Sequence, residues 1–360
     1  MGFITWLTGP IRSIYALEQR DAVLDASGVA IPPTAIEGDT FSVLEEHRLA
    51  AALHRRRSLL VGLPVLLAAA ALLYGYSQGQ GHAVNQSALR VAILLAFGGF
   101  ALSTAANTGF WLFGQVAKHR VLSVLAAQHG LEYRIAGVPK HEADPFEAQG
   151  LFGYRSNGGS TEDAFSGMID GVDFQLFETL RMHYNKGFNG GGTQVFHGLC
   201  LRLSFPKRFS GTTRVLGEGD AALKRLDETA PDLSLERVRL EDATFEELFE
   251  VVSSDQVEAR YLLTPSLMER LVDLQGVLGP RTRLRAAFHD RHLLVTLSQQ
   301  KSRRMRTKIF AGKLDKLHHF EIKDAHRPVE EMDLIRQFER ELDVVNALVT
   351  TVKINMKTRV

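Results

Sequence analysis

Two long apolar runs dominate the pattern of hydrophobic and polar positions along the chain. They extend over Leu59–Tyr76 and Val91–Phe113, and the polar segment Ser77–Arg90 separates them with Arg90 as its one fixed charge. Each run is close to the roughly 20 residues that an α-helix needs to cross the hydrocarbon of a bilayer. Leu59–Tyr76 contains no charged residue, which argues against a helix in a soluble core. The pattern therefore predicts an N-terminal two-helix transmembrane hairpin.

Basic residues on the outer sides of this hairpin predict its orientation. Arg55–Arg57 precede the first run, and Lys118 and Arg120 follow the second. Positive charge in short flanking segments stays on the cytoplasmic side of a membrane. We therefore expect both termini and the soluble part to be cytoplasmic, with the turn Ser77–Arg90 on the outside.

Small residues recur at fourth positions of the second run, at Ala101, Ala105 and Gly109, with Gly98 and Gly99 just before them. Small side chains let two membrane helices approach closely. We expect the first run to be the neighbouring helix.

After the hairpin the hydrophobic period changes to two. Apolar side chains alternate along Val195–Phe205, and Asp170–Gly171 has the composition of a tight hairpin turn between Phe165–Ile169 and Val172–Arg181. Further strand-like stretches are Thr212–Leu216, Arg237–Leu240, Leu284–Phe288 and Leu293–Leu297. The alternation along Val195–Phe205 predicts a strand with one buried face. The soluble part is predicted to be α+β, with a mainly antiparallel sheet.

Two amphipathic helices accompany these strands. Thr264 and Pro265 have the composition of an N-cap and first helical residue. A long C-terminal helix is predicted after Pro328, with an apolar stripe at Ile335, Phe338, Leu342, Val345, Val349 and Val352. Such a stripe packs on the sheet of its own domain, or it joins two subunits as a short coiled coil.

Composition sets bounds without identifying an activity. The chain has 360 residues and a net charge of +1, so global electrostatics selects no partner. Its one cysteine, Cys200, excludes an intramolecular disulfide and suits the cytoplasm. We divide the chain into an N-terminal segment with a linker (1–39), the hairpin with cytoplasmic helix extensions (40–129) and the α+β domain (130–360).

A longer motif lies in the soluble part. Residues Ser253–Pro265 read SSDQVEARYLLTP, and Val195–Leu199 read VFHGL. Together these segments resemble an uncharacterised bacterial family of unknown function, whose members have an N-terminal membrane hairpin followed by a cytoplasmic domain. The resemblance implies an inner-membrane protein of a bacterium and implies no catalytic residues.

The residues of this motif allow two interpretations. Asp255 and Glu258 have the spacing of a capping box, and Arg260 lies within reach of such carboxylates, so the motif can be structural. Alternatively, the same three residues form a polar binding surface for a ligand or divalent metal.

Charge is strongly polarised along the soluble part. The stretch Glu218–Glu258 is acidic, and Arg281–Lys313 is basic. The two stretches can pair in the fold, or the basic one can face anionic lipid. The candidate lipid contacts are Lys301, Arg303, Arg304, Arg306 and Lys308. Aromatic residues are nearly absent from this stretch, so nucleic acid is not expected.

Motifs of catalysis are absent from the sequence. His197 and Cys200 are three residues apart on a predicted strand, so their side chains point to opposite faces. No metal-ligand or phosphate-loop motif occurs, and no cofactor is predicted. The sequence favours a membrane-anchored interaction or scaffolding module that contacts the lipid bilayer and a protein partner, or self-associates through its C-terminal helix. The alternatives are a membrane-surface enzyme, hydrolytic or metal-dependent, and an anionic-lipid-binding module.

Overall fold

The computed structural model describes residues 40–78, 86–184, 192–205, 208–217, 220, 234–278, 282–299, 320, 322, 327–331 and 333–357. They form two compact units. The first holds the described residues of Ile31–Val124 and Ile322–Arg336, and the second holds those of Leu125–Glu321 and Gln337–Val360. The predicted segment 1–39 lies outside the described residues, and the predicted domain division stays a prediction.

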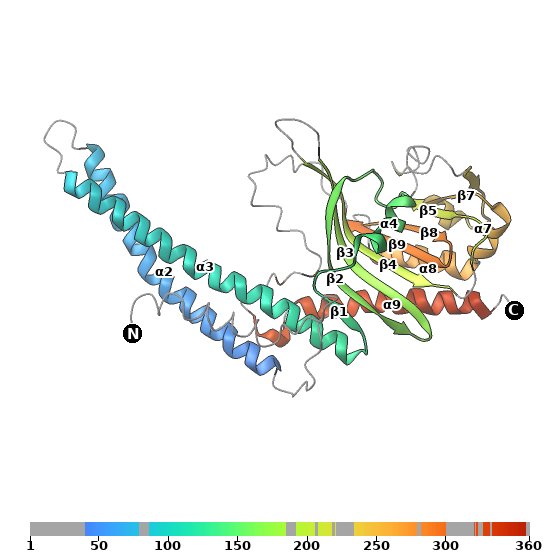
Figure 1. The fold of residues 1–360 in the computed structure, drawn as a ribbon, viewed down its shortest axis with the longest axis horizontal. Coiled ribbons are helices and arrows are strands. Elements are labelled where there is room, and N and C mark those ends of the chain that lie inside the picture. Colours follow the sequence, from blue (N-terminus) through green and yellow to red (C-terminus); the bar gives the residue numbers. More distant parts are fainter. Residues whose placement is uncertain are drawn as a thin grey trace. The chain divides into compact units, whose positions relative to one another are not determined.

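Two long antiparallel helices make up most of the first unit (Figure 1). They are α2 (Thr40–Gln78) and α3 (Gln86–Gln128), and η2 (Val329–Glu331) contacts α2. The helix α3 continues into the second unit, and Gly130, whose φ is 66°, lies two positions after its last residue, Gln128. The Leu131 N–H donates to the Ala126 carbonyl at 2.8 Å, which closes the last turn. A glycine with positive φ is the usual residue just after such a helix end.

The two helices approach each other closely at Gly62 and Gly99. A Cβ atom on Gly99 would lie 2.7 Å from Leu66 Cγ and 3.0 Å from the Gly62 carbonyl oxygen. A Cβ atom on Gly62 would lie 3.1 Å from Ser103 Oγ. The contact thus excludes larger side chains, as the small residues in the sequence predict.

Within α2, the segment Phe41–Gly75 is long and apolar enough to cross a membrane. The apolar part of α3 among the described residues, Leu89–Thr104, is shorter. An N-terminal apolar helix is therefore present, whereas the predicted pair of spanning helices is not established.

A single antiparallel sheet forms the second unit. Its strands are β1 (Glu132–Arg134), β2 (Gly158–Ile169), β3 (Val172–Tyr184), β4 (Gly192–Ser204), β5 (Thr213–Gly217), β6 (Glu236–Val238), β7 (Phe249–Ser253), β8 (Thr282–His289) and β9 (His292–Gln299). The order across the sheet is β1-β2-β3-β4-β9-β8-β5-β7-β6. The helices of this unit are α4 (Lys140–Ala148), α6 (Ala243–Leu248), α7 (Gln256–Leu262), α8 (Pro265–Leu278) and most of α9 (Asp333–Lys357). The predicted α+β class is confirmed.

The predicted hairpin turn joins β2 and β3. Asp170 and Gly171 have φ values of 53° and 81°, and Ile169 pairs with Val172. Positive φ at both central residues matches the right-handed twist of the flanking strands, which is why Asp-Gly occurs here.

The strand β4 is buried on both of its faces, so the prediction that this strand buries one face is wrong. Leu199, Cys200 and Leu201 are consecutive on β4, and each is at most 3% exposed. Cys200 belongs to the core cluster that includes Phe146 of α4. Because neighbouring residues of a strand point to opposite faces, Leu199 and Leu201 face the other side. Consecutive residues of β4 are buried, instead of alternating with exposed ones, because both faces of the strand are covered.

The helix α9 packs on the face opposite α4. Its Phe338 ring lies 5.2 Å from Phe165 of β2, and Lys353 contacts Asp170 at 3.4 Å. Leu342, Val345 and Val349 are buried, Ile335 is partly exposed, and the side chain of Val352 lies outside the described residues. The apolar stripe therefore faces the helix's own sheet, which favours that interpretation over a coiled coil between subunits.

Candidate functional site

A pocket of about 590 Å³ lies beside α4 in the second unit. Its wall consists of one side of α4, the segment from Gly150 to Asn157, and the end of β3. The ionisable residues that line it are Lys140, Asp144, Glu147, Tyr154, Arg155 and His183. A volume of this size suits a small organic molecule.

Hydrogen bonds fix the wall of this pocket. The Glu147 carboxylate accepts from the Ser156 backbone N–H at 2.8 Å and from the Ser156 hydroxyl at 2.9 Å. The Asn157 side chain donates to the Tyr184 carbonyl at 2.8 Å and accepts from the Tyr184 N–H at 2.7 Å. These bonds join the loop to α4 and β3, so the pocket wall is preformed.

An aromatic pair forms part of the same wall. The ring of Tyr154 meets that of His183 edge to face, with centroids 5.6 Å apart. The His183 Nδ1 atom is hydrogen-bonded to the Arg155 carbonyl oxygen at 3.2 Å. This arrangement orients the imidazole and places an apolar surface next to the charged side chains.

The segment from Gly150 to Asn157 also provides the floor of the pocket, and Arg285 of β8 holds this loop on the sheet. Its Nη1 atom donates to the Leu151 carbonyl at 2.8 Å, and the Thr296 hydroxyl lies 3.4 Å from the same oxygen. Gly153 has a φ of 78°, and a Cβ atom there would lie 2.8 Å from Arg285 Nη2. Glycine is therefore needed both for the backbone conformation and for the approach of the guanidinium.

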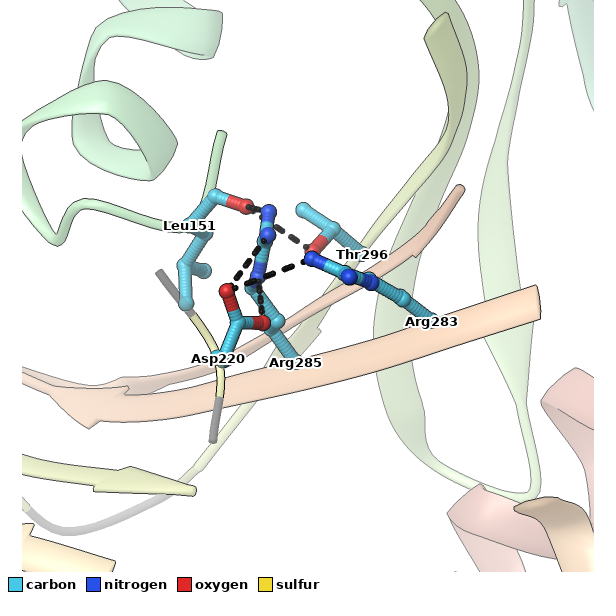
Figure 2. Close-up of polar contacts among 5 residues, drawn as sticks. All are labelled: Leu151, Asp220, Arg283, Arg285 and Thr296. Carbon is cyan, nitrogen blue, oxygen red and sulfur yellow. Dashed lines mark hydrogen bonds and ion pairs between the residues drawn. The ribbon is translucent and has the colours of Figure 1, made fainter. Parts of the chain in front are cut away.

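Asp220 compensates the charge of this arginine, as Figure 2 shows. Its carboxylate accepts from Arg285 Nε at 2.7 Å and Nη2 at 3.0 Å, and Arg283 Nη1 lies 3.5 Å away. The side chains of Asp220 and Arg285 are only 3% and 7% exposed. A bidentate, buried pair of this kind fixes the guanidinium beneath the loop.

Two further buried arginines approach this loop or the end of α4 that precedes it. Arg181 of β3 lies over the Phe152 ring, 5.2 Å from its centroid. Arg214 of β5 is fully buried and donates to Gln149 Oε1 at 3.3 Å and to the Ala148 carbonyl at 3.5 Å. Burial lowers the pKa of Arg214 to about 10.

Neither of these two arginines contacts a carboxylate in the described part of the chain. Arg181 Nε and Nη2, as well as Arg214 Nη1, are buried and make no hydrogen bond among the described residues. The loop that forms the pocket floor thus lies on positive charge. Side chains from four strands, β3, β5, β8 and β9, contact this loop and the end of α4 that precedes it.

The predicted motif lies elsewhere, at the start of α7. Asp255 accepts from the backbone N–H groups of Val257 and Glu258 at 3.0 and 2.9 Å and is the N-cap. These donors, Glu258 first, and the Ser210 hydroxyl lower the pKa of Asp255. The predicted cap is confirmed.

The second hydrogen bond of the predicted capping box, from the Asp255 backbone N–H to the Glu258 carboxylate, is not formed, so this part of the prediction is wrong. The Glu258 carboxylate instead accepts from the backbone N–H groups of Ser210 and Gly211, at 2.9 and 2.8 Å. The Asp255 N–H donates to Ser253 Oγ at 3.0 Å. The carboxylates therefore join α7 to the loop before β5.

Arg260 does not join this cluster. It is exposed, and among the described residues it reaches only Gln256 of its own helix, at 3.4 and 3.5 Å. The structure thus brings Asp255 and Glu258 together and leaves Arg260 apart. A binding surface at these three residues stays a prediction.

Pairing between the acidic and basic stretches is confirmed at one place. Asp220 of the acidic stretch binds Arg283 and Arg285 of the basic stretch. The candidate lipid contacts Lys301, Arg303, Arg304, Arg306 and Lys308 lie outside the described residues.

The structure also locates the histidine and cysteine that the sequence excludes as a catalytic pair. His197 Nε2 lies 2.8 Å from the buried carboxylate of Glu178, whereas Cys200 lies in the core cluster on the other face. Their predicted separation is confirmed. Among the described residues, no group of three or more His, Cys, Asp or Glu side chains has the arrangement of a metal site.

Sequence reasoning missed the pocket because its residues form no motif. One signal was present: arginine interrupts apolar strands at Arg285, between Leu284 and Ala286, and at Arg181, between Leu180 and Met182. A charged residue inside a buried strand requires specific partners. The partner of Arg285 in the loop is the Leu151 carbonyl, and the partner of Arg181 is the Phe152 ring.

Comparison with known proteins identifies no activity. No curated protein matches the chain. Among solved structures, the crystal structure of the mycobacterial trehalose monomycolate transport factor A, TtfA, is similar to 66% of this chain over 95% of its own length, with 10% identity and a TM-score of 0.34. A TM-score of this size does not establish a common fold. Residues 194–354 match a family described as protein of unknown function (DUF3137), which confirms the predicted domain of unknown function in this part of the chain.

Proposed function

We propose that this chain is a membrane-anchored interaction module. In this proposal α2 and α3 cross the inner membrane of a bacterium as a hairpin, and the α+β unit binds a partner on the cytoplasmic side. The partner is a protein or a small ligand, and the lipid bilayer is the permanent environment of the hairpin.

The observation that carries the proposal is the distribution of side-chain size on α2 and α3. Small residues lie where the helices meet, at Gly62 and Gly99. Five large apolar side chains of the two helices point outward and are 63% to 71% exposed, at Leu60, Leu67, Leu94, Phe97 and Phe100. Water would oppose this arrangement, whereas lipid favours it, because membrane helices pack through small residues and present large apolar ones to the acyl chains.

Binding is preferred to catalysis because of where the perturbed groups lie. Burial raises the pKa of Tyr133 and Cys200 well above their ordinary values and lowers that of Arg214. Active sites concentrate such groups in a cleft. None of the three lines the pocket that the described residues form.

Membrane extraction tests the anchor. The full chain, expressed in a bacterium, should stay in the membrane fraction through an alkaline carbonate wash. Leu67→Arg combined with Leu94→Arg should release it, because each arginine near the bilayer centre costs about 2.5 to 3.5 kcal/mol. Tyr261→Arg is the matched control, since Tyr261 is also about as exposed, at 70%, but lies on α7. Release of the unmodified chain by carbonate would contradict the proposal.

A further inference from the structure

The pocket beside α4 contains fixed charges that form no ion pair with the described residues. Lys140 and Arg155 line it and take part in none of the ion pairs in the described part of the chain. Both side chains are exposed at the surface. They are therefore available to a ligand without first breaking an internal contact.

The two carboxylates that line the pocket, Glu147 and Asp144, differ in how far they offset the positive charge of Lys140 and Arg155. Glu147 has both oxygens on the Ser156 hydroxyl and one on its N–H, at 2.8 to 3.0 Å, and so belongs to the wall. Asp144 is the remaining carboxylate in the lining, and it is exposed, where solvent screens its charge.

The guanidinium groups of Arg181 and Arg214 lie behind the pocket floor and add to the positive charge of Lys140 and Arg155. Arg181 stacks on Phe152, and Arg214 donates to the carbonyl of Ala148; both Phe152 and Ala148 line the pocket. Neither guanidinium faces a carboxylate among the described residues, and charges in a low-dielectric interior act over longer distances than charges in water. The floor therefore has a positive potential toward the pocket.

We propose that this pocket binds an organic anion, a molecule whose phosphate or carboxylate group is held by Arg155 and Lys140. The uncharged part of the ligand lies against Tyr154, and the volume of about 590 Å³ leaves room for it. A guanidinium and an ammonium are the side chains that bind such oxyanions best. The inference deepens the binding role proposed above, and it does not require that the hairpin spans a membrane.

Equilibrium dialysis of the full chain in neutral detergent tests the proposal, with glycerol 3-phosphate and citrate as probes. At low salt at least one probe should bind, and added salt should weaken the binding. Arg155→Gln and Lys140→Gln should each weaken it by roughly tenfold or more, since a charge-assisted hydrogen bond is lost. Arg260→Gln, an exposed arginine on α7, should have no effect.

Asp144→Asn separates binding from a merely structural role. Removing this carboxylate should tighten the binding of either anion, because it removes repulsion from the pocket, whereas structural damage would weaken it. Absence of binding of both probes, weaker binding in Asp144→Asn, or an equal loss in Arg260→Gln would overturn the proposal.

A second arm distinguishes a soluble phosphate from a lipid headgroup. In nanodiscs of phosphatidylcholine with phosphatidic acid added, competition against glycerol 3-phosphate would assign the phosphate to a lipid, and absence of competition would assign it to a soluble molecule. Either result supports the oxyanion site. Failure of the carbonate experiment would leave these binding results unchanged, so the two proposals fail separately.

Discussion

Replacing Asp220 by asparagine should destabilise the second unit strongly. The change keeps the shape of the side chain and removes the charge that faces Arg285. The guanidinium would remain buried, with its bond to the Leu151 carbonyl and without a counter-ion. Removing one partner of a buried pair typically costs about 3 to 5 kcal/mol, because the other charge is left uncompensated in a low dielectric.

A second ion pair supplies the matched control. Arg208 and Asp290 are as close, at 2.7 Å, but their side chains are 71% and 39% exposed. Asp290→Asn should cost about 0 to 1 kcal/mol, because water screens the pair and solvates the remaining arginine. Asparagine also tolerates the φ of 53° at this position. The two substitutions therefore remove the same charge from a buried and from an exposed ion pair, and the Asp220 site in addition has a second bond to Arg285 and a contact with Arg283.

Labelling of Cys200 measures this difference. It is the one cysteine of the chain and is fully buried in the core cluster beside α4, so a thiol reagent reacts only after the unit opens. When opening is fast relative to labelling, a cost of about 3 to 5 kcal/mol raises the rate roughly 100- to 4,000-fold. Asp290→Asn should raise it roughly fivefold at most.

Equal labelling rates in the two variants would refute this reasoning. It would mean that the Asp220–Arg285 pair contributes no more than a surface pair. A further variant, Asp220→Asn with Arg285→Met, should recover part of the loss, because it removes the stranded charge.

Three other predictions follow from the contacts described. Asp255→Ala should lower the melting temperature of the second unit, since α7 loses its N-cap. Folding lowers the pKa of Asp255. The difference in melting temperature from the wild type should therefore be full above the ordinary aspartate pKa and should shrink as the pH falls through the pKa of the folded state. Gly99→Leu should disrupt the α2–α3 contact and lower the temperature at which helical circular dichroism is lost in detergent, whereas Gly98→Leu should leave that temperature unchanged, because a Cβ atom at Gly98 meets nothing within 4 Å. Neutralising the candidate lipid contacts should abolish binding of the detergent-free α+β fragment to anionic vesicles if the lipid hypothesis holds, and persistence of that binding would contradict it; the residues are Lys301, Arg303, Arg304, Arg306 and Lys308.

Elements with a strong local signal could be predicted from the sequence. The Asp170–Gly171 turn is an example, because positive φ at two consecutive residues restricts the residue types. The helix α8 is another, since Thr264 and Pro265 mark its start and the apolar residues Leu267 and Leu271 are both buried. In each case neighbouring residues contain the information.

Features that depend on tertiary contacts could not be predicted. Burial of both sheet faces requires α4, which has no distinctive capping residue because Pro139 precedes it without a side-chain hydrogen bond. Glu258 has the spacing of a capping box, yet its carboxylate binds the backbone of Gly211, 47 positions earlier in the chain. The pocket depends in the same way on Arg285 reaching Leu151, 134 positions away. The spacing of residues along the sequence contains no information about contacts between residues so far apart.

Site-specific thiol labelling on intact cells tests the membrane-anchored account most directly. In a Cys200→Ala background, single cysteines at Ser77, at the end of α2, and at Arg260, on the surface of α7, report the two sides of the bilayer; both positions are exposed. The account predicts that an impermeant maleimide labels Ser77→Cys on intact cells and labels Arg260→Cys only after lysis. Labelling of Arg260→Cys on intact cells, or protection of Ser77→Cys until lysis, would contradict it.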